Sequence, residues 1–185
     1  MGLGWFGAPE HTRWLAAETH ALLAYARAAR VPSGFGWIGQ DGVVDRDHPV
    51  ELWITGRMTF AFSLGALLGI PGCRRYADHG VRALRTVMRD TDHGGWYSAV
   101  GHQVDASGRA TPVDPLARKE CYQHAFVMLA AATAAAADRP GATELLGDVI
   151  EVVNRYWWDE AHGMPVESYA ADFTDPEDYR GINAA

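Results

Sequence analysis

Two kinds of helical pattern alternate along the chain. Residues 9–30, 74–90 and 143–157 carry apolar side chains at intervals of three and four, with charged residues elsewhere, which predicts amphipathic helices. Residues 49–70 and 118–137 are apolar on almost every side, which is typical of helices surrounded by protein. We therefore expect a mainly helical fold in which the second and fourth helices lie inside and the other three lie outside.

The alternation indicates an internal repeat of an outer helix, a long loop and an inner helix, with a spacing of roughly 65 residues. The loops after the outer helices contain aromatic and turn residues, such as Gly94-Gly95-Trp96-Tyr97, and short β-hairpins are expected there. The repeat places these loops on one rim.

A third inner helix, extrapolated from the repeat, would begin close to Ala185. We therefore expect residues 1–185 to form a single domain that is truncated before this helix. Helix pairs of this kind bury a core only by stacking, so a missing helix leaves apolar faces that another chain would cover.

Acidic side chains outnumber basic ones by 23 to 16, which gives a formal net charge of −7. Nucleic-acid binding needs clustered lysine and arginine, and the chain has a single lysine, Lys119. The longest apolar run, residues 125–137, is shorter than the ~20 residues that cross a bilayer. We expect neither nucleic acid nor a membrane as a partner.

Cys73 and Cys121 form no C-x-x-C pair and lie far apart, so the sequence encodes neither a zinc knuckle nor a disulfide framework. Residues 1–5 contain no cationic segment followed by an apolar one, which argues against a secretory signal. A cytoplasmic protein is the simplest expectation.

Arg57 lies in the middle of an apolar helix, and its neighbours three and four positions away include no carboxylate. Burying an unpaired guanidinium costs several kcal/mol, so Arg57 must meet a distant acid, carbonyl groups or a polar cavity. Two interpretations stay open: a salt bridge to another element, and an arginine that faces a ligand.

His124 begins the apolar part of the fourth helix, with Glu120 one turn earlier as a partner that would orient it. A lone helical histidine is more often a core residue than a catalyst. However, Arg57 and His124 occupy comparable positions on successive inner helices, whose side chains would converge on one central cavity. That coincidence favours a shared site.

Four rim aromatics have two open interpretations, because they would either stack on sugar C–H faces or plug the end of a helical barrel. They are Trp37, Trp96, Tyr97 and Trp158. The other histidines lack H-E-x-x-H or paired spacing, and the glycine-rich stretches lack nucleotide-binding motifs. We therefore expect no metal and no nucleotide cofactor.

Four segments occur in an order that is specific when they are taken together: residues 52–60 (LWITGRMTF), 94–97 (GGWY), 119–126 (KECYQHAF) and 179–184 (YRGINA). With them the chain resembles the N-acylglucosamine 2-epimerase superfamily, and within it the mannose isomerase type of aldose–ketose isomerase. The resemblance implies an all-α barrel of six helix pairs, a partial (α/α)6 barrel here because only the N-terminal half is present.

The reaction implied by the resemblance opens a hexose ring and moves a proton between C1 and C2 of the linear sugar through a cis-enediol. Histidines would serve as base and acid, without metal or nicotinamide, and a pKa near ~6.5 suits them to this task. In the family the last segment continues into Asn-Met-His, and a second catalytic histidine lies near the C-terminus. Both would lie beyond Ala185.

The resemblance also assigns roles to four residues of this chain. Arg57 would bind substrate oxygens and support the enediolate charge, and His124 would contact or polarise the sugar. Trp53 would line the pocket, and Arg180 would bind substrate. The chain would then supply the substrate-binding half of a monosaccharide isomerase, with a complementary half or a second copy of itself as its protein partner.

Two alternatives of other classes remain. A glycan hydrolase or lyase on a similar toroid would use an acidic pair, for which Glu51 and Glu120 at the starts of the inner helices are the candidates. A noncatalytic assembly module would use the exposed apolar faces and no catalytic centre.

Overall fold

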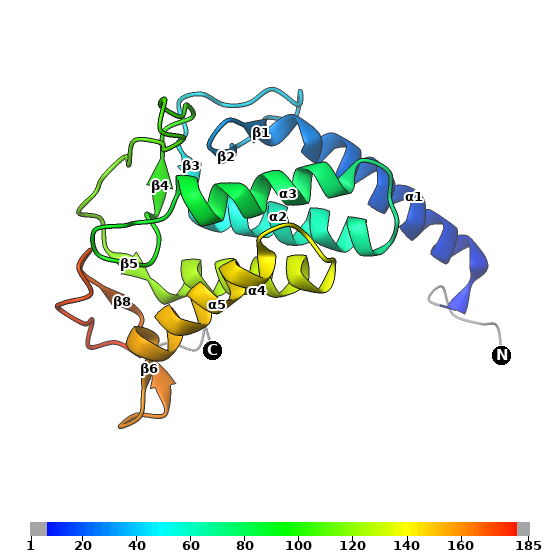
Figure 1. The fold of residues 1–185 in the computed structure, drawn as a ribbon. Helices are drawn as coiled ribbons and strands as arrows, with labels where there is room; N and C mark the ends of the chain where they lie inside the picture. Colours follow the sequence, from blue (N-terminus) through cyan, green and yellow to red (C-terminus); the bar gives the residue numbers. More distant parts are fainter. Residues whose placement is uncertain (1–6, 181–185) are drawn as a thin grey trace.

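The computed structural model describes residues 7–180, and this part of the chain contains five α-helices joined by loops and short strands (Figure 1). The helices are α1 (Pro9–Ala26), α2 (Leu52–Leu67), α3 (Cys73–Arg82), α4 (Cys121–Ala136) and α5 (Ala142–Val152). Three shorter helical segments extend α1, α3 and α5, namely η2 (Arg27–Ala29), η3 (Ala83–Val87) and η4 (Val153–Trp157). The prediction of a helix-rich fold is confirmed.

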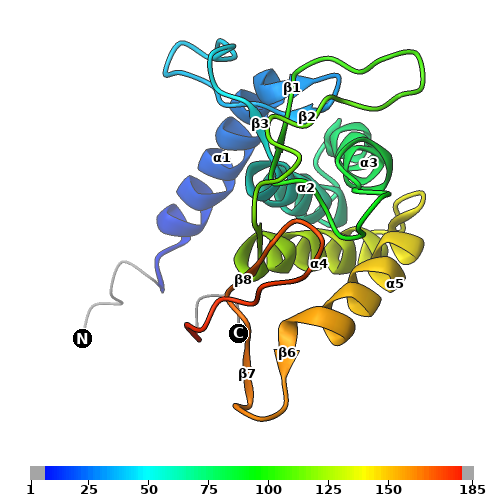
Figure 2. The ribbon, with the colours of Figure 1, turned by 90° about the vertical axis from the view of Figure 1, so that its left-hand side faces the viewer.

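The helices form two layers. α2 and α4 pack against each other, while α3 covers α2 and α5 covers α4 (Figure 2). One core cluster joins α3, α4 and α5, and a second joins α1, α2 and α3. α3 and α5 therefore lie outside α2 and α4, as the alternation of helix types predicts.

Glycines let the helices approach closely. A Cβ on Gly56 of α2 would come within 2.9 Å of the Phe126 backbone oxygen in α4. A Cβ on Gly80 of α3 would overlap the hydroxyl of Thr59 in α2 and lie 2.8 Å from the Thr59 Cβ. α2 is thus fixed between its two neighbours by contacts that leave no room for another methyl group.

Strand pairs connect the repeated units at the end of the bundle where α2 and α4 begin (Figure 1). β3 (Val50–Glu51) runs directly into α2 and pairs antiparallel with β4 (Ala99–Val100). β5 (Lys119–Glu120) runs directly into α4 and pairs in the same way with β8 (Ser168–Tyr169). These pairings were not expected from the sequence, because each one joins segments about 50 residues apart.

Two local hairpins agree with the expectation for the rim loops. β1 (Arg30–Val31) pairs with β2 (Gly34–Phe35), and β6 (Trp158–Asp159) pairs with β7 (Met164–Pro165). The repeat itself is slightly longer than predicted, since α2 begins at Leu52 and α4 at Cys121, 69 positions later. α3 and α5 begin with the same offset, at Cys73 and Ala142.

The apolar face of α2 is less covered than the sequence predicts. Leu64, Leu67 and Leu68 are 40%, 51% and 70% exposed, so α2 is not surrounded by protein within the described chain. On α1, Leu15 and Leu22 are also exposed, which agrees with the apolar faces that a missing helix was expected to leave open. The correction has a simple cause: between residues 7 and 180, no element packs over these faces.

The apolar run at residues 125–137 forms most of α4, and the faces of α4 that meet α2 and α5 are buried. No helix among the described residues combines the length and the apolar character needed to cross a membrane. Cys73 and Cys121 are both buried and unpaired, which agrees with the predicted lack of a disulfide.

The close approach of α3 and α2 predicts that Gly80→Ala lowers the free energy of unfolding by about 1–3 kcal/mol, because the added methyl group overlaps Thr59. Gly147→Ala in α5 is the matched control, since nothing lies within 4 Å of its added Cβ, and it should raise stability by up to about 1 kcal/mol. Urea denaturation measures both. Equal effects of the two substitutions would contradict this packing.

Candidate functional site

Arg57 lies on the accessible face of α2 and is held by side chains of two helices. Its guanidinium carbon is 4.9 Å from the ring centroid of Trp53 and 4.3 Å from that of Phe126. Its Nη2 donates a hydrogen bond of 2.8 Å to the hydroxyl of Tyr122. In residues 7–180 no carboxylate pairs with Arg57, so the salt-bridge interpretation finds no support there.

The aromatic surroundings of Arg57 continue toward the rim. The rings of Trp53 and Trp37 meet edge to face, with centroids 5.8 Å apart. Trp37 Nε1 donates a 2.6 Å hydrogen bond to the carboxylate of Glu51, the residue before α2. We call the five residues Trp37, Trp53, Arg57, Tyr122 and Phe126 the aromatic wall.

The aromatic wall combines one fixed positive charge with flat apolar surfaces. A guanidinium has five N–H donors, and only one hydrogen bond of Arg57 is made within the described chain. The remaining donors are available to hydroxyl or enolate oxygens of a ligand, while the rings suit C–H faces. The wall therefore has the chemistry needed to bind a polar, weakly anionic organic molecule.

His124 lies behind the wall, on the side of α4 that faces the outer layer. It is 1% exposed, and the rings of Trp96, Trp157 and Phe173 surround it. Its Nδ1–H donates to the Glu120 carbonyl (2.8 Å), and its Nε2 accepts from the backbone N–H of Trp96 (3.3 Å). Burial lowers the pKa of His124 to about 3, against the weaker opposite effect of the Glu120 carbonyl.

The environment of His124 is that of a neutral core histidine, because both ring nitrogens already have partners. His124 and Phe126, the ring on α4 that Arg57 contacts, are two positions apart and therefore lie on opposite sides of this helix. The structure therefore gives His124 a supporting position, and it does not bring together the two residues that the sequence placed in one cavity.

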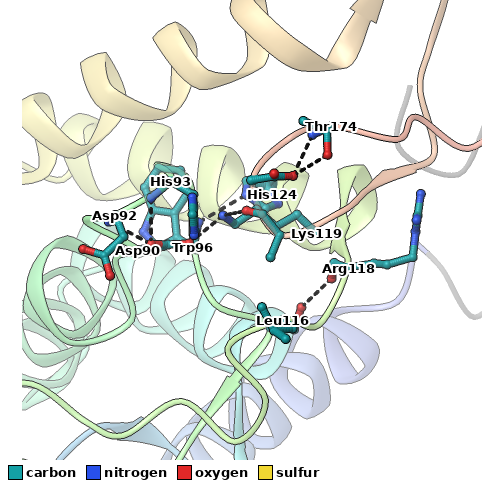
Figure 3. A network of polar contacts seen from close by, with 12 residues as sticks. Asp90, Asp92, His93, Trp96, Leu116, Arg118, Lys119, His124 and Thr174 are labelled. Carbon is teal, nitrogen blue, oxygen red and sulfur yellow. Dashed lines mark hydrogen bonds and ion pairs between the residues drawn. The ribbon is translucent and has the colours of Figure 1, made fainter.

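A buried ion pair fixes the start of α4 (Figure 3). Lys119 and Asp90 are 2% and 0% exposed, and Lys119 Nζ lies 2.6 Å from Asp90 Oδ2. Nζ also donates to the Ala171 carbonyl, and Asp90 Oδ1 accepts from the backbone of Asp92 and His93. Burial alone would raise the pKa of Asp90, but these bonds outweigh it and hold the pKa below its usual range.

Arg180 makes the corresponding contact in the next unit. Its Nη2 and Nε lie 3.0 and 3.2 Å from Asp159 Oδ2. Asp159 also pairs with His162 at 2.8 Å, and these two partners lower its pKa to about 2. Arg180 is thus occupied by a carboxylate and joins no residue of the aromatic wall. Residues 181–184 of the fourth resemblance segment lie outside the described residues.

The rim aromatics divide between the two interpretations left open by the sequence. Trp96 is completely buried and donates to the Leu84 carbonyl, so it belongs to the core. Trp37 and Trp158 are exposed, and Tyr97 is half-buried. Of these four residues, Trp37 belongs to the aromatic wall through its contact with Trp53.

Glu51 and Glu120 are each engaged by a neighbour, Glu51 by Trp37 and Glu120 by the side-chain amide of Gln123 (2.9 Å). Neither contact brings the two carboxylates together as a catalytic pair. No group of three or more His, Cys, Asp and Glu side chains in the described part of the chain is arranged to hold a metal ion.

Sequence reasoning missed Tyr122 and Phe126 as partners of Arg57. Both lie on α4, one turn apart, and their rings meet edge to face at 5.1 Å. The 69-residue offset of the repeat places Phe126 at the position that corresponds to Arg57, so the repeat in the sequence could have identified Phe126. It also aligns Asp90 with Asp159 and Gly94 with Gly163, so the repeated D-x-x-H-G sequence marks both carboxylate turns.

Comparison with known proteins finds relatives over nearly the whole chain. The sequence profile of the family described as N-acylglucosamine 2-epimerase (GlcNAc 2-epimerase) matches residues 34–185. D-mannose isomerases of Pseudomonas cannabina pv. alisalensis and Thermobifida fusca are 39% and 42% identical over 180 and 181 residues. Each match covers 97% of this chain but only 41% and 42% of the relative.

Comparison with solved structures finds proteins of the same kinds. A crystal structure of a D-mannose isomerase superposes with a TM-score of 0.79 and 25% identity, over 96% of this chain and 44% of the other. The cellobiose 2-epimerase of Spirochaeta thermophila superposes with a TM-score of 0.73 and 23% identity, over 91% and 42%, which shows a shared fold. The chain therefore spans less than half the length of the proteins it matches.

The buried state of His124 predicts a loss of stability in acid. Its pKa is about 3 in the folded chain and near 6.5 when exposed, so only the unfolded chain gains this proton as the pH falls below 6.5. The free energy of unfolding should fall by roughly 1.4 kcal/mol per pH unit between pH 6 and pH 4 through this group.

Urea denaturation across this pH range measures the slope. His124→Phe should flatten it, whatever its effect on stability at pH 7, and His20→Gln, which removes an exposed histidine of α1, should leave it unchanged. A slope that survives in His124→Phe would assign the acid sensitivity to other groups.

The pair between Arg180 and Asp159 predicts that Arg180→Ala raises the pKa of Asp159 from about 2 toward 3.8, because one of its two stabilising partners is lost. Carbon-13 NMR of the carboxylate measures this value directly. Arg155→Ala removes an equal charge from a nearby position that stacks on Tyr156, and it serves as the control. An unchanged value in Arg180→Ala would mean that His162 alone holds the carboxylate ionised.

Proposed function

Because this chain belongs to the N-acylglucosamine 2-epimerase family, we propose that it forms the sugar-binding part of an isomerase that interconverts an aldose such as mannose with its ketose. The observation that carries the proposal is the position of Arg57. It is a cation that pairs with no carboxylate among residues 7–180, and it is fixed between two aromatic rings on an accessible helix face.

The proposed reaction moves a proton between C1 and C2 of the open-chain sugar. Removal of the C2 proton of an aldose places negative charge on the C1 oxygen and gives an enediolate. The hydroxyl proton of O2 then moves to O1, and uptake of a proton at C1 leaves the carbonyl of the ketose at C2. A guanidinium that donates to these oxygens stabilises the charge as it develops, and it does so best when its position is fixed in advance. Tyr122, Trp53 and Phe126 supply that fixation here.

The proton itself needs a base within ~2.6–3.2 Å, and His124 is not suited to this role. Its pKa of about 3 and its two existing hydrogen bonds leave it neutral and turned away from the aromatic wall. We propose that His124 positions α4, that Arg180 anchors the segment before the next helix, and that the proton-transferring histidines come from outside residues 1–185.

The exposed faces of α1 and α2 support the same division of roles. We propose that further helix pairs pack there and complete an (α/α)6 barrel around the aromatic wall, supplied by the rest of a longer chain or by a second polypeptide. Covering Leu67 and Leu68 alone would remove their exposed apolar area from water, at about 25 cal/mol per Å².

The decisive experiment compares the 185-residue chain with a protein that contains the complementary helices. In deuterated water the chain alone, with its mass verified, should exchange no proton at C2 of mannose and form no fructose. The completed protein should do both. In it, Arg57→Ala should lower kcat by about 100-fold or more with a smaller change in KM, because enediolate charge exists only after the substrate has bound.

Arg13→Ala is the matched control, since Arg13 is an exposed arginine of α1 whose ion pair within residues 7–180 is with Glu10. It should leave kcat and KM unchanged. Isomerisation by the verified 185-residue chain would refute the proposed division of roles. A pure KM effect of Arg57→Ala would limit Arg57 to holding the substrate.

A further inference from the structure

The outer side of α3 carries a second polar depression that the proposed reaction does not use. It is a cavity of about 480 Å³ between the end of α3 with its extension η3 and the loop at residues 105–109. Four arginines line it, three from one helical face (Arg82, Arg85 and Arg89) and one from the loop (Arg109). We call this cavity the arginine basin.

The charges of the arginine basin are not compensated. None of its four arginines takes part in an ion pair within residues 7–180, although the chain as a whole has a net charge of −7. Arg82 Nη2 donates to the Pro32 carbonyl and lies 3.4 Å from Nδ1 of His79, and Arg109 donates to the Thr91 hydroxyl. Arg85 makes none of the described hydrogen bonds.

Arg89 is the best fixed of the four. Its guanidinium carbon lies 4.4 Å from the centroid of the Trp96 ring, and its Nη1 is buried without a hydrogen-bond partner in the described chain. The nearest acid of the loop, Asp105, is already used, since it accepts hydrogen bonds from Ser107 and from the backbone of Arg109. The basin therefore has hydrogen-bond donors and positive charge, and its lining residues include no carboxylate.

The lining specifies the chemistry of a ligand. Guanidinium groups match phosphate oxygens in charge and in geometry, and the hydroxyls of Thr91 and Ser107 add polar contacts. No aromatic or aliphatic residue lines the cavity, so charged and hydroxyl groups supply its specific contacts. Its volume exceeds that of a single phosphate group and leaves room for a polar, hydroxylated body.

We infer that the arginine basin binds a phosphorylated sugar, with the phosphate held by the arginines and the sugar hydroxyls by the loop. This site is distinct from the aromatic wall. The basin lies on α3 and η3, whereas Arg57 lies on the α2 face that packs with α4. The inference does not rest on the proposed isomerase function.

Isothermal titration of the 185-residue chain with glucose 6-phosphate tests the inference, with glucose, inorganic phosphate and pyrophosphate as comparison ligands at constant ionic strength. Glucose 6-phosphate should bind with a stoichiometry of one and more tightly than the other three. Arg85→Gln and Arg109→Gln should each weaken it at least tenfold, and because both side chains are exposed, the fold should persist in circular dichroism.

Two control variants separate the possible outcomes. Arg13→Gln removes the same charge far from the basin, and Arg57→Ala disables the aromatic wall; both should leave glucose 6-phosphate binding within twofold. Equal weakening by Arg13→Gln would reveal general attraction to anions, and loss in Arg57→Ala would place the ligand on the aromatic wall. Tighter binding of phosphate or pyrophosphate than of the sugar phosphate would show an anion site without sugar recognition. Each of these results overturns the inference.

Discussion

The buried ion pair of Lys119 and Asp90 is the contact on which the arrangement of the site depends. Lys119 lies two residues before the first residue of α4, and Asp90 follows the outer helix of the preceding unit. Loss of one partner would leave the other charge buried, at a cost of about 3–5 kcal/mol, so the start of α4 has little freedom to move. Since Tyr122 and Phe126 lie in the first turns of α4, the same pair fixes the partners of Arg57.

The second unit contains an equivalent ion pair made by different residues. Asp159 occupies the position of Asp90, and Arg180 reaches it from the segment that follows β8. In both turns a backbone N–H of a left-handed glycine, Gly94 or Gly163, bonds back to the aspartate carbonyl. Both units therefore contain an ion pair between the turn after an outer helix and a later segment, with a lysine in the first unit and an arginine in the second.

The helices were predictable from the sequence because their cause is local. Apolar spacing and turn residues mark each helix, and Pro9 begins the first one as expected. The β3–β4 and β5–β8 pairs were not predictable, since they depend on how two units stack. Burial was overestimated for α2, because an apolar helix pattern reports what a helix would bury and not whether a covering element is present in the described chain.

The candidate site was only half predictable for a related reason. Arg57 stood out as an unneutralised charge in an apolar helix, and that signal needs no tertiary information. The role of His124 depends on which side of α4 faces the cavity. The sequence of a helix that is apolar on every side does not show which side that is. The packing of Trp96 and Trp157 decides it, by enclosing the imidazole on the outer side.

The exposure of Arg57 connects the packing of further helices with the proposed reaction. In the described chain its guanidinium is exposed, and water screens its attraction for a developing negative charge. Helices packed over Leu64 and Leu68 would also remove water from the neighbouring aromatic wall. The positive charge of Arg57 would then act in an environment of lower dielectric constant. An enediolate beside Arg57 would gain most of its stabilisation at that moment. The proposed reaction therefore requires the apolar faces to be covered, as the fold does. The same packing of helices buries the exposed leucines and strengthens the attraction of Arg57 for the enediolate.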